Sequence, residues 1–290
     1  MQNLSFGIIT PSYTPDYERC CLLHQSIRSF VSSPYTHYIV VAQSDFQLFK
    51  GLANETTKVL VVESILPRWI KREPIFKKVW ISLKGLPIRN WLLQQIVKIA
   101  TAQFIPEELI IFADSDVAFV KPYNLSNLLQ QDQLRLYCDP IGNPMQKQMH
   151  QKWHESAAKL LDVEVDPQIP DFIGQVMTWR RSNVISLCKR IEEVTGKSWI
   201  NAIANTWHFS EYVLYGVYVT QILKASARHY LDAQTICHDY WDPRPLSTEE
   251  IREFIKTIKP HQFAIMISAK AGISIQQYQS MLKEVSQELS

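Results

Sequence analysis

Four apolar, β-branched runs alternate with segments of helical periodicity, and this alternation restricts the possible folds more than any other feature of the chain. The strand-like runs lie at residues 5–13, 36–43, 58–64 and 109–120, and the clearest helical patterns lie at 16–30 and 90–104. Strands that are apolar on both faces need helices on both faces, which is typical of a parallel sheet. The pattern therefore predicts an α/β fold with a Rossmann-like, mostly parallel central sheet flanked by helices.

The second half of the chain is less regular. Strand-like and helical segments are predicted at 135–140, 152–163, 174–194, 209–223 and 235–241. Beyond them, Ser247 and Glu250 have the spacing of a capping box at the start of a helix. Two amphipathic helices are therefore expected to end the chain.

The fourth apolar run is interrupted by two aspartates, Asp114 and Asp116, with one serine between them. Loops at the carboxyl ends of parallel strands are free to meet a ligand, so this D-S-D loop is expected to share one rim with residues 10–13. A desolvated carboxylate needs a positive partner. Carboxylate oxygens favour Mg²⁺ or Mn²⁺, which makes a metal ion the first candidate.

Charge and cysteine content exclude several classes of protein. The net charge is +2, from 30 basic and 28 acidic side chains, so no general affinity for nucleic acid is expected. The five cysteines lack C-x-x-C spacing and fit free thiols in a reducing compartment. The first residues do not form a basic region followed by a long apolar segment, and no apolar run is long enough to cross a bilayer. A cytoplasmic protein without a transmembrane segment is predicted.

Several short motifs, taken in order, resemble nucleotide-sugar glycosyltransferases of the GT-A fold. They are TPSYTPDYERC after the first run, WLLQQIVKIA, the D-S-D, GQVMTWRR and FSEYVLYG. The likeness extends to about His238. Together the motifs resemble those of a bacterial subfamily associated with surface polysaccharide genes. It implies a GT-A domain at 1–245, with a nucleotide-binding half (1–140) and an acceptor-binding half (141–245). Residues 246–290 are then a C-terminal helical extension packed on the same domain.

The resemblance implies a nucleotide-sugar donor, with a UDP-sugar as the first candidate, whose diphosphate is bridged to the D-S-D loop by Mn²⁺ or Mg²⁺. Asp116 is expected to bind the ion directly, and Asp114 to contact the ribose or the ion through water. Such enzymes often take a third metal ligand from a late histidine, which indicates His238, with Asp239 as its substitute. A purely structural histidine is the alternative.

Other donor contacts are expected in the loop at residues 10–13 and on the helix at 90–104. The loop would line the nucleotide pocket, unless it is an ordinary strand-to-helix connection. On the helix, Trp91 is expected in the core, while Lys98 on the same side is a candidate phosphate or sugar ligand. The full set of expected donor contacts is Thr10, Pro11, Ser12, Tyr13, Arg19, Gln94, Lys98, Asp114, Ser115, Gly174 and Gln175. Arg180 or Arg181 is a further candidate for the diphosphate, with solvation as the alternative.

Glu211 begins the predicted helix at 209–223, where the helix dipole favours an ionised carboxylate. The resemblance implies that Glu211 is the base for the acceptor hydroxyl, with Asp171 as the rival base or a donor-sugar contact. A glutamate in a first turn is also ordinary helix chemistry. A single base opposite a metal-held diphosphate fits a one-step displacement in line, which inverts the anomeric centre.

The acceptor is expected to be a glycan, a lipid-linked sugar or a small molecule. Basic and aromatic residues alternate at 68–85, which suits peripheral association with the inner face of a membrane, or an anionic glycan. A charged loop over an ordinary core is the alternative interpretation.

Two other functions stay open. Phosphohydrolases of the haloacid dehalogenase type also carry D-x-D after an apolar strand, although their motif closes the first strand, whereas three strands precede it here. A catalytically inactive GT-A-like binding protein would keep the same fold.

Overall fold

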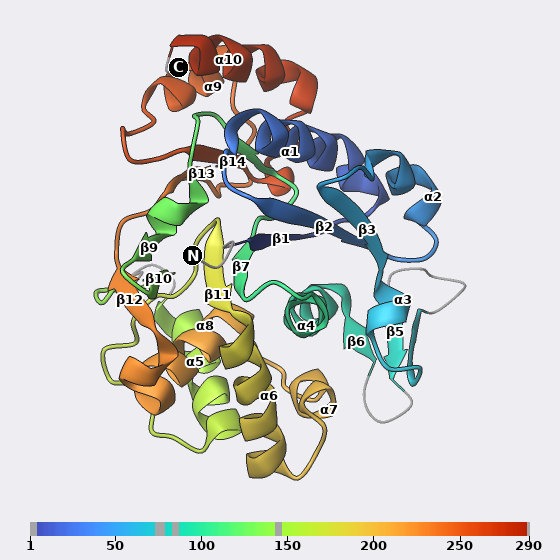
Figure 1. The fold of residues 1–290 in the computed structure, drawn as a ribbon, viewed down its shortest axis with the longest axis vertical. Coiled ribbons are helices and arrows are strands. Elements are labelled where there is room, and N and C mark those ends of the chain that lie inside the picture. Colours follow the sequence, from blue (N-terminus) through green and yellow to red (C-terminus); the bar gives the residue numbers. More distant parts are fainter. Residues whose placement is uncertain (1–4, 73–78, 83–86, 143–146, 289–290) are drawn as a thin grey trace.

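The computed structural model describes residues 5–72, 79–82, 87–142 and 147–288 (Figure 1). Its central sheet has five strands in the order β11-β7-β1-β2-β3. The strands are β1 (Phe6–Pro11), β2 (Tyr35–Val41), β3 (Thr57–Val61), β7 (Leu109–Phe112) and β11 (Met177–Arg180). All neighbours are parallel except β11, which runs antiparallel to β7. The predicted α/β fold with a mostly parallel central sheet is therefore confirmed.

One helix covers each face of this sheet. Successive strand residues point to opposite faces, so the apolar strands present buried side chains to both helices. Ile8 of β1 and Ile111 of β7 pack with helix α1 (Tyr17–Phe30), whereas Ile9 and Phe112 pack with helix α4 (Asn90–Phe104). Figure 1 shows α1 and α4 on opposite sides of the sheet. Short elements join these units: η1 (Thr14–Asp16), α2 (Phe46–Phe49), η2 (Lys50–Leu52), α3 (Val62–Ile65), β4 (Ile70–Arg72), β5 (Val79–Ser82) and β6 (Ile88–Arg89).

The middle of the chain forms a helical layer that shares one core with α4. Its helices are α5 (Lys147–Leu161), α6 (Arg181–Thr195), α7 (Trp199–Ala204) and α8 (Glu211–Val217), followed by η5 (Tyr218–Leu223) and η6 (Lys224–Ala227). A second sheet, in the order β12-β10-β9, consists of β9 (Leu129–Gln130), β10 (Gln133–Tyr137) and β12 (His229–Asp232), and η3 (Leu125–Leu128) precedes it. This layer brings α8 beside α4.

The apolar run at 109–120 is two strands in two sheets, not the single strand that its composition predicts. After β7 the chain turns at the D-S-D loop, where the Val117 amide donates to the Asp114 carbonyl oxygen at 3.0 Å. It then continues as β8 (Val117–Phe119), which pairs with β14 (Ala264–Ile267), itself paired with β13 (Cys237–Tyr240). The aspartates therefore lie at a junction between two sheets.

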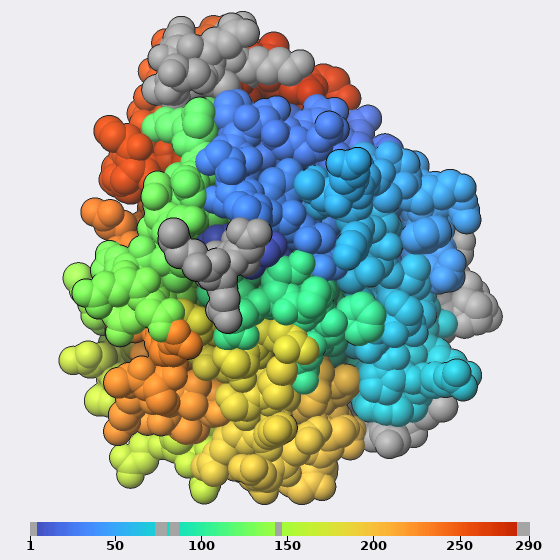
Figure 2. Space-filling view, in the orientation of Figure 1, coloured from blue at the N-terminus to red at the C-terminus, as the bar shows by residue number. Residues whose placement is uncertain are grey.

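The C-terminal segment packs against α1 and β8. The capping box of Ser247 and Glu250 begins helix α9 (Thr248–Lys256), as predicted, and α10 (Ile275–Glu288) ends the described chain. Between them lie β14 and the short η7 (Ala269–Ala271), so this segment is not helical throughout. In Figure 2 the red C-terminal helices border the blue surface of α1. No helix in the described ranges has the length and apolarity that crossing a bilayer requires.

Candidate functional site

The D-S-D loop and the loop after β1 meet at the carboxyl ends of their strands, as predicted. β1 and β7 are parallel neighbours with Ile9 opposite Phe112. Beyond that pair, the Thr10 hydroxyl donates to the Ala113 carbonyl oxygen at 2.8 Å. The two loops therefore share one rim of the sheet.

Lys98 lies at the centre of a buried polar network on this rim. Its ammonium is 2.9 Å from Asp114 Oδ1 and 3.2 Å from Glu211 Oε1, and it donates to the Tyr212 hydroxyl at 2.9 Å. The Glu211 amide in turn donates to Gln95 Oε1 at 2.9 Å. One helix, α4, thus connects the first aspartate of the motif with the first residue of α8.

The two carboxylates of this network share one cation among the described residues. Although burial alone would lower the pKa of Lys98, the Asp114 carboxylate, Tyr212 and the Glu211 carboxylate hold that pKa well above its ordinary value. Burial raises the pKa of Glu211, against the opposing influence of Lys98. Lys98 is therefore charged at neutral pH, and Glu211 is more basic than an exposed glutamate.

Asp116 turns away from Lys98, toward the C-terminal segment. Its Oδ2 accepts a hydrogen bond from the Ala269 amide at 3.2 Å. Burial, reinforced by the Asp114 charge, raises the pKa of Asp116 to about 6. Asp16 lies near by and accepts a hydrogen bond from the Ser115 side chain, and burial also raises the pKa of Asp16. Arg19 offsets part of this charge, but no described residue forms an ion pair with Asp116, so this side of the motif stays predominantly negative.

The oxygen atoms on this side fit a hard divalent cation. Within the described ranges, no three His, Cys, Asp or Glu side chains are grouped to hold an ion on their own. Mg²⁺ commonly uses one or two protein carboxylates and takes its remaining ligands from substrate phosphates and water. Asp116, with Asp114 beside it, can supply that share.

His238 faces away from this rim. Its Nε2 lies 2.9 Å from the Phe254 carbonyl oxygen and 3.1 Å from Thr257 Oγ1, and its ring stacks on Phe254 with centroids 4.1 Å apart. This placement corrects the expectation of a metal ligand, because the ring packs against α9. The next residue of β13, Asp239, points to the other face, where its Oδ2 accepts from Trp241 Nε1 at 2.6 Å.

The loop after β1 is only partly available to a ligand. Thr10 is fully buried, and its hydroxyl also lies 3.0 Å from His37 Nε2, so it organises the rim instead of facing a nucleotide. Pro11 is buried and Ser12 half-buried, whereas Tyr13 is 53% exposed. Tyr13 is therefore the member of this loop best placed to meet a base or ribose.

Arg19 contacts the C-terminal segment instead of an open phosphate site. Its guanidinium donates to the carbonyl oxygens of Ile267 at 3.1 Å and Ile273 at 2.5 Å, and to the Tyr278 hydroxyl at 3.3 Å. These three bonds attach residues 267–278 to α1. The expected phosphate contact is not supported.

On α4 the polar and apolar positions differ from expectation by one residue. Gln94 is exposed, and its neighbour Gln95 is buried against Glu211. Trp91, expected in the core, is 48% exposed. Lys98 is buried and contacts two carboxylates, and its expected contact with a phosphate or sugar stays a prediction.

Asp171, Gly174 and Gln175 lie near β10. The Asp171 Oδ1 accepts from the Ile173 amide at 2.8 Å and lies 3.7 Å from His150 Nδ1, and burial raises the pKa of Asp171. Gly174 and Gln175 line a recess of about 10 Å³ together with Asp239. Asp171 is therefore paired with a histidine and contacts none of the groups around Lys98.

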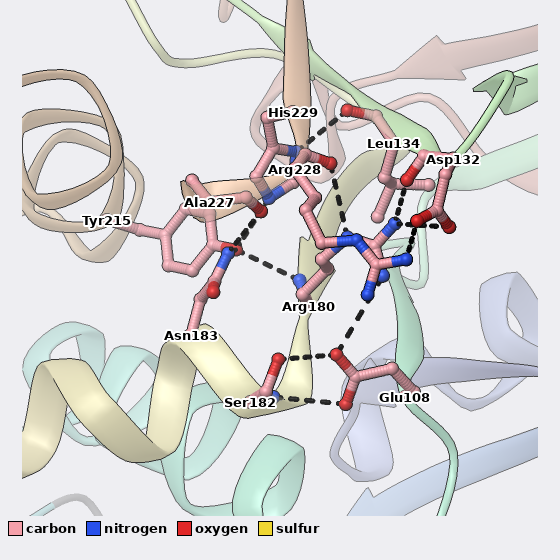
Figure 3. A network of polar contacts seen from close by, with 10 residues as sticks. All are labelled: Glu108, Asp132, Leu134, Arg180, Ser182, Asn183, Tyr215, Ala227, Arg228 and His229. Atoms are coloured by element: carbon pink, nitrogen blue, oxygen red, sulfur yellow. Dashed lines mark hydrogen bonds and ion pairs between the residues drawn. The ribbon is translucent and has the colours of Figure 1, made fainter. Parts of the chain in front are cut away.

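Arg180 and Arg181 lie at the amino end of β7, the end opposite to the D-S-D loop. Arg180 pairs with Leu109, the first residue of β7, and its Nη2 donates to the Asp132 carbonyl oxygen at 2.5 Å, in the network drawn in Figure 3. Arg181 Nη2 donates to the Gln103 carbonyl oxygen at 3.1 Å. The expectation that one of them binds the diphosphate is wrong, because the antiparallel direction of β11 carries both away from the D-S-D loop.

Sequence reasoning missed Asp16, Gln95 and Tyr212 as members of this rim. Tyr212 follows the candidate base directly, and Gln95 is one position from the glutamine that the helical pattern indicates. Asp16 stands in the PDYE segment, where an aspartate next to a helix start is ordinary capping chemistry. None of the three has a local signal of its own.

The chain matches one protein family over nearly its whole length. No curated protein matches it. Among solved structures it is similar to the crystal structure of mouse xyloside xylosyltransferase 1 in its apo form, with 12% sequence identity, a TM-score of 0.46, and coverage of 93% of this chain and 100% of that chain. The family model described as "Family of unknown function (DUF6492)" matches residues 4–288. The protein therefore belongs to the family DUF6492.

Proposed function

We propose that the protein is a metal-dependent glycosyltransferase that moves a sugar from a nucleotide-sugar donor, with a UDP-sugar as the first candidate, to an acceptor hydroxyl. The observation that carries the proposal is the contact of one ammonium, Lys98 Nζ, with both Asp114 and Glu211. It joins a candidate donor loop to a candidate base at the carboxyl edge of a parallel sheet. Group transfer requires both functions within reach of one reacting carbon.

The donor side consists of Asp116 and its neighbours. Asp116 and Asp114 would hold Mn²⁺ or Mg²⁺, since their oxygens suit a hard cation and Asp116 has no ion-pair partner in the described chain. When bound, such an ion supplies Lewis-acid stabilisation of the charge on the leaving nucleoside diphosphate. Tyr13, exposed on the same rim, would contact the base or ribose.

The acceptor side consists of Glu211. Burial raises its pKa, which improves it as an acceptor for the proton of an attacking hydroxyl. Lys98 keeps the carboxylate in place at 3.2 Å, and the Gln95 side chain holds the first turn of α8. After Glu211 takes the proton, Lys98 still has Asp114 as its counter-ion. Asp171 stays the rival base.

This arrangement supports a single in-line displacement with inversion, because it offers one base and one leaving-group site. Proton NMR of the product formed from an α-linked UDP-sugar tests the stereochemistry. A β-linked product is expected. An α-linked product would reject inversion but not transfer itself.

A thermal-shift panel tests the function as a whole. We expect a nucleotide-sugar to raise the melting temperature in Mn²⁺ but not in EDTA, because a ligand that binds only the folded state stabilises it. Asp116→Ala should lose this shift, while the exposed Asp242 provides a matched control, Asp242→Ala, that keeps it. No shift with any nucleoside diphosphate or nucleotide-sugar would reject the proposal.

A second variant separates the base from the binding residues. Glu211→Gln should lower kcat by about 10²-fold, the usual contribution of a general base, with donor affinity nearly unchanged. Equal losses in donor binding and turnover would make Glu211 a binding residue and Asp171 the favoured base. Hydrolysis of a generic phosphate ester, without sugar transfer, would instead support the phosphohydrolase alternative.

A further inference from the structure

Two exposed tryptophans lie at the start of α4 and just before α8, the two helices that meet at Glu211. Trp91, in the first turn of α4, is 48% exposed, and Trp207, four residues before Glu211, is 66% exposed. Single exposed apolar side chains are ordinary on a protein surface, whereas a group of them bordered by polar residues marks a binding surface. Neither ring is needed to fill the core described above.

Each tryptophan is held in position by a neighbour. The Trp91 ring lies next to Trp153, with centroids 6.3 Å apart. The Arg89 guanidinium lies 4.4 Å from the centre of the Trp207 ring and donates to the Trp207 carbonyl oxygen at 2.6 Å. Restrained rings lose little entropy on binding, which favours them as contact surfaces.

Hydrogen bonds connect this surface to Glu211. Gln95 Nε2 donates to the Trp91 carbonyl oxygen at 3.3 Å, while its Oε1 accepts from the Glu211 amide at 2.9 Å. Arg89 is two residues before Trp91 and contacts Trp207, so both rings border the start of α4. The segments that carry the two rings are therefore tied to the first turn of α8, where Glu211 lies.

We propose that Trp91 and Trp207 form a platform for a carbohydrate acceptor, an oligosaccharide that stacks at least two sugar rings on them. This inference rests on the proposed function for the identity of the reacting hydroxyl. A sugar ring has apolar C–H faces and a polar edge, so it can cover an indole face while its hydroxyls meet polar neighbours. Arg89, whose guanidinium lies over the Trp207 ring, is such a neighbour.

The surface chemistry favours a glycan over a lipid or an isolated small molecule. A membrane contact would need an apolar patch with basic residues around it. Here the rings alternate with hydrogen-bonding groups, and the Arg89 cation at the patch already donates to a backbone carbonyl. Two separate indole rings can also stack two sugar rings, which favours an oligosaccharide over a single sugar.

Binding of glycans without donor or metal tests the platform. The wild-type protein in EDTA is applied to an immobilised array of oligosaccharides and monosaccharides, and the affinity for bound structures is measured by tryptophan fluorescence. We expect selective binding of oligosaccharides, weakened about tenfold or more in Trp91→Ala and in Trp207→Ala. Trp91→Phe should keep most of the affinity, because the aromatic face remains.

Phe104 provides a matched control. It is 59% exposed and lies at the other end of α4, so Phe104→Ala removes a comparable exposed ring away from the platform. It should bind glycans as the wild type does, and circular dichroism should show that all variants are folded. The platform is rejected if no array member binds the wild type, or if both alanine variants bind normally. Binding to phosphatidylglycerol vesicles that is lost with the same rings would reject it in favour of a membrane contact.

The outcomes for platform and catalysis are distinguishable. Glycan binding in EDTA without any response to nucleotide-sugars would keep the platform and reject the transferase. A response to nucleotide-sugars in Mn²⁺, with no glycan bound, would keep the transferase and reject the platform.

Discussion

Replacement of Asp116 by asparagine is expected to stabilise the metal-free protein at neutral pH. The folded-state pKa of Asp116 is about 6, against an ordinary value of 3.8. The folded state therefore binds the proton more tightly than the unfolded state, and the stability from this proton is lost as the pH rises from about 4 to about 6. The two pKa values differ by about 2, and each step of one is worth about 1.4 kcal/mol, so the ionised carboxylate costs at most about 3 kcal/mol.

An asparagine carries no charge, so Asp116→Asn escapes this loss while the new side-chain oxygen can still accept from the Ala269 amide. In urea unfolding with EDTA at pH 7.5, the variant should be more stable than the wild type by up to about 3 kcal/mol. Near pH 4 the two should be equal. Asp242→Asn, at an exposed aspartate, should change neither value.

Mn²⁺ should offset most of this difference in stability. An ion that binds only the folded state stabilises the wild type by about 2.7 kcal/mol at a concentration one hundred times its Kd. The variant should gain much less. Equal stability of the two proteins at pH 7.5 in EDTA would refute the argument that the ionised Asp116 carboxylate destabilises the fold.

Three further outcomes are expected. Lys98→Met leaves Asp114 and Glu211 without a cation and should cost about 3–5 kcal/mol in urea unfolding; a loss below about 1 kcal/mol would contradict an ionised pair. Arg19→Ala should speed amide hydrogen exchange in residues 264–282 but not in α4, and unchanged exchange would show that its three hydrogen bonds do not hold the C-terminal segment. Burial lowers the pKa of His37 to about 3, below its ordinary value of 6.5, so wild-type stability should fall as the pH drops from 6.5 toward 3; His37→Gln should flatten that dependence, and an unchanged slope would contradict it.

Local signals predict most of the regular structure. The helix expected at 90–104 is α4 (Asn90–Phe104), and the capping box at Ser247 is present, because periodicity and capping depend on neighbours in sequence. The prediction of one strand at 109–120 is wrong, since apolar character does not record which sheet each half joins. β14 escapes prediction for the same reason: four apolar residues become a strand only when β8 and β13 are beside them.

By itself the sequence determined that two carboxylates interrupt a buried run, and that they follow strands of a mostly parallel sheet. Only the tertiary structure decided which side chains meet them. Lys98, Asp114 and Glu211 come from three separate segments, and packing of α4 against the sheet and α8 brings them together. The direction in which a side chain points also depends on the tertiary structure. Successive residues of a strand point to opposite faces, and His238 lies on the face that packs against α9. Successive residues of a helix are rotated by about 100°, so that Gln95, and not Gln94, contacts Glu211. A shift of one residue therefore decides whether a side chain joins the buried hydrogen-bond network or faces solvent.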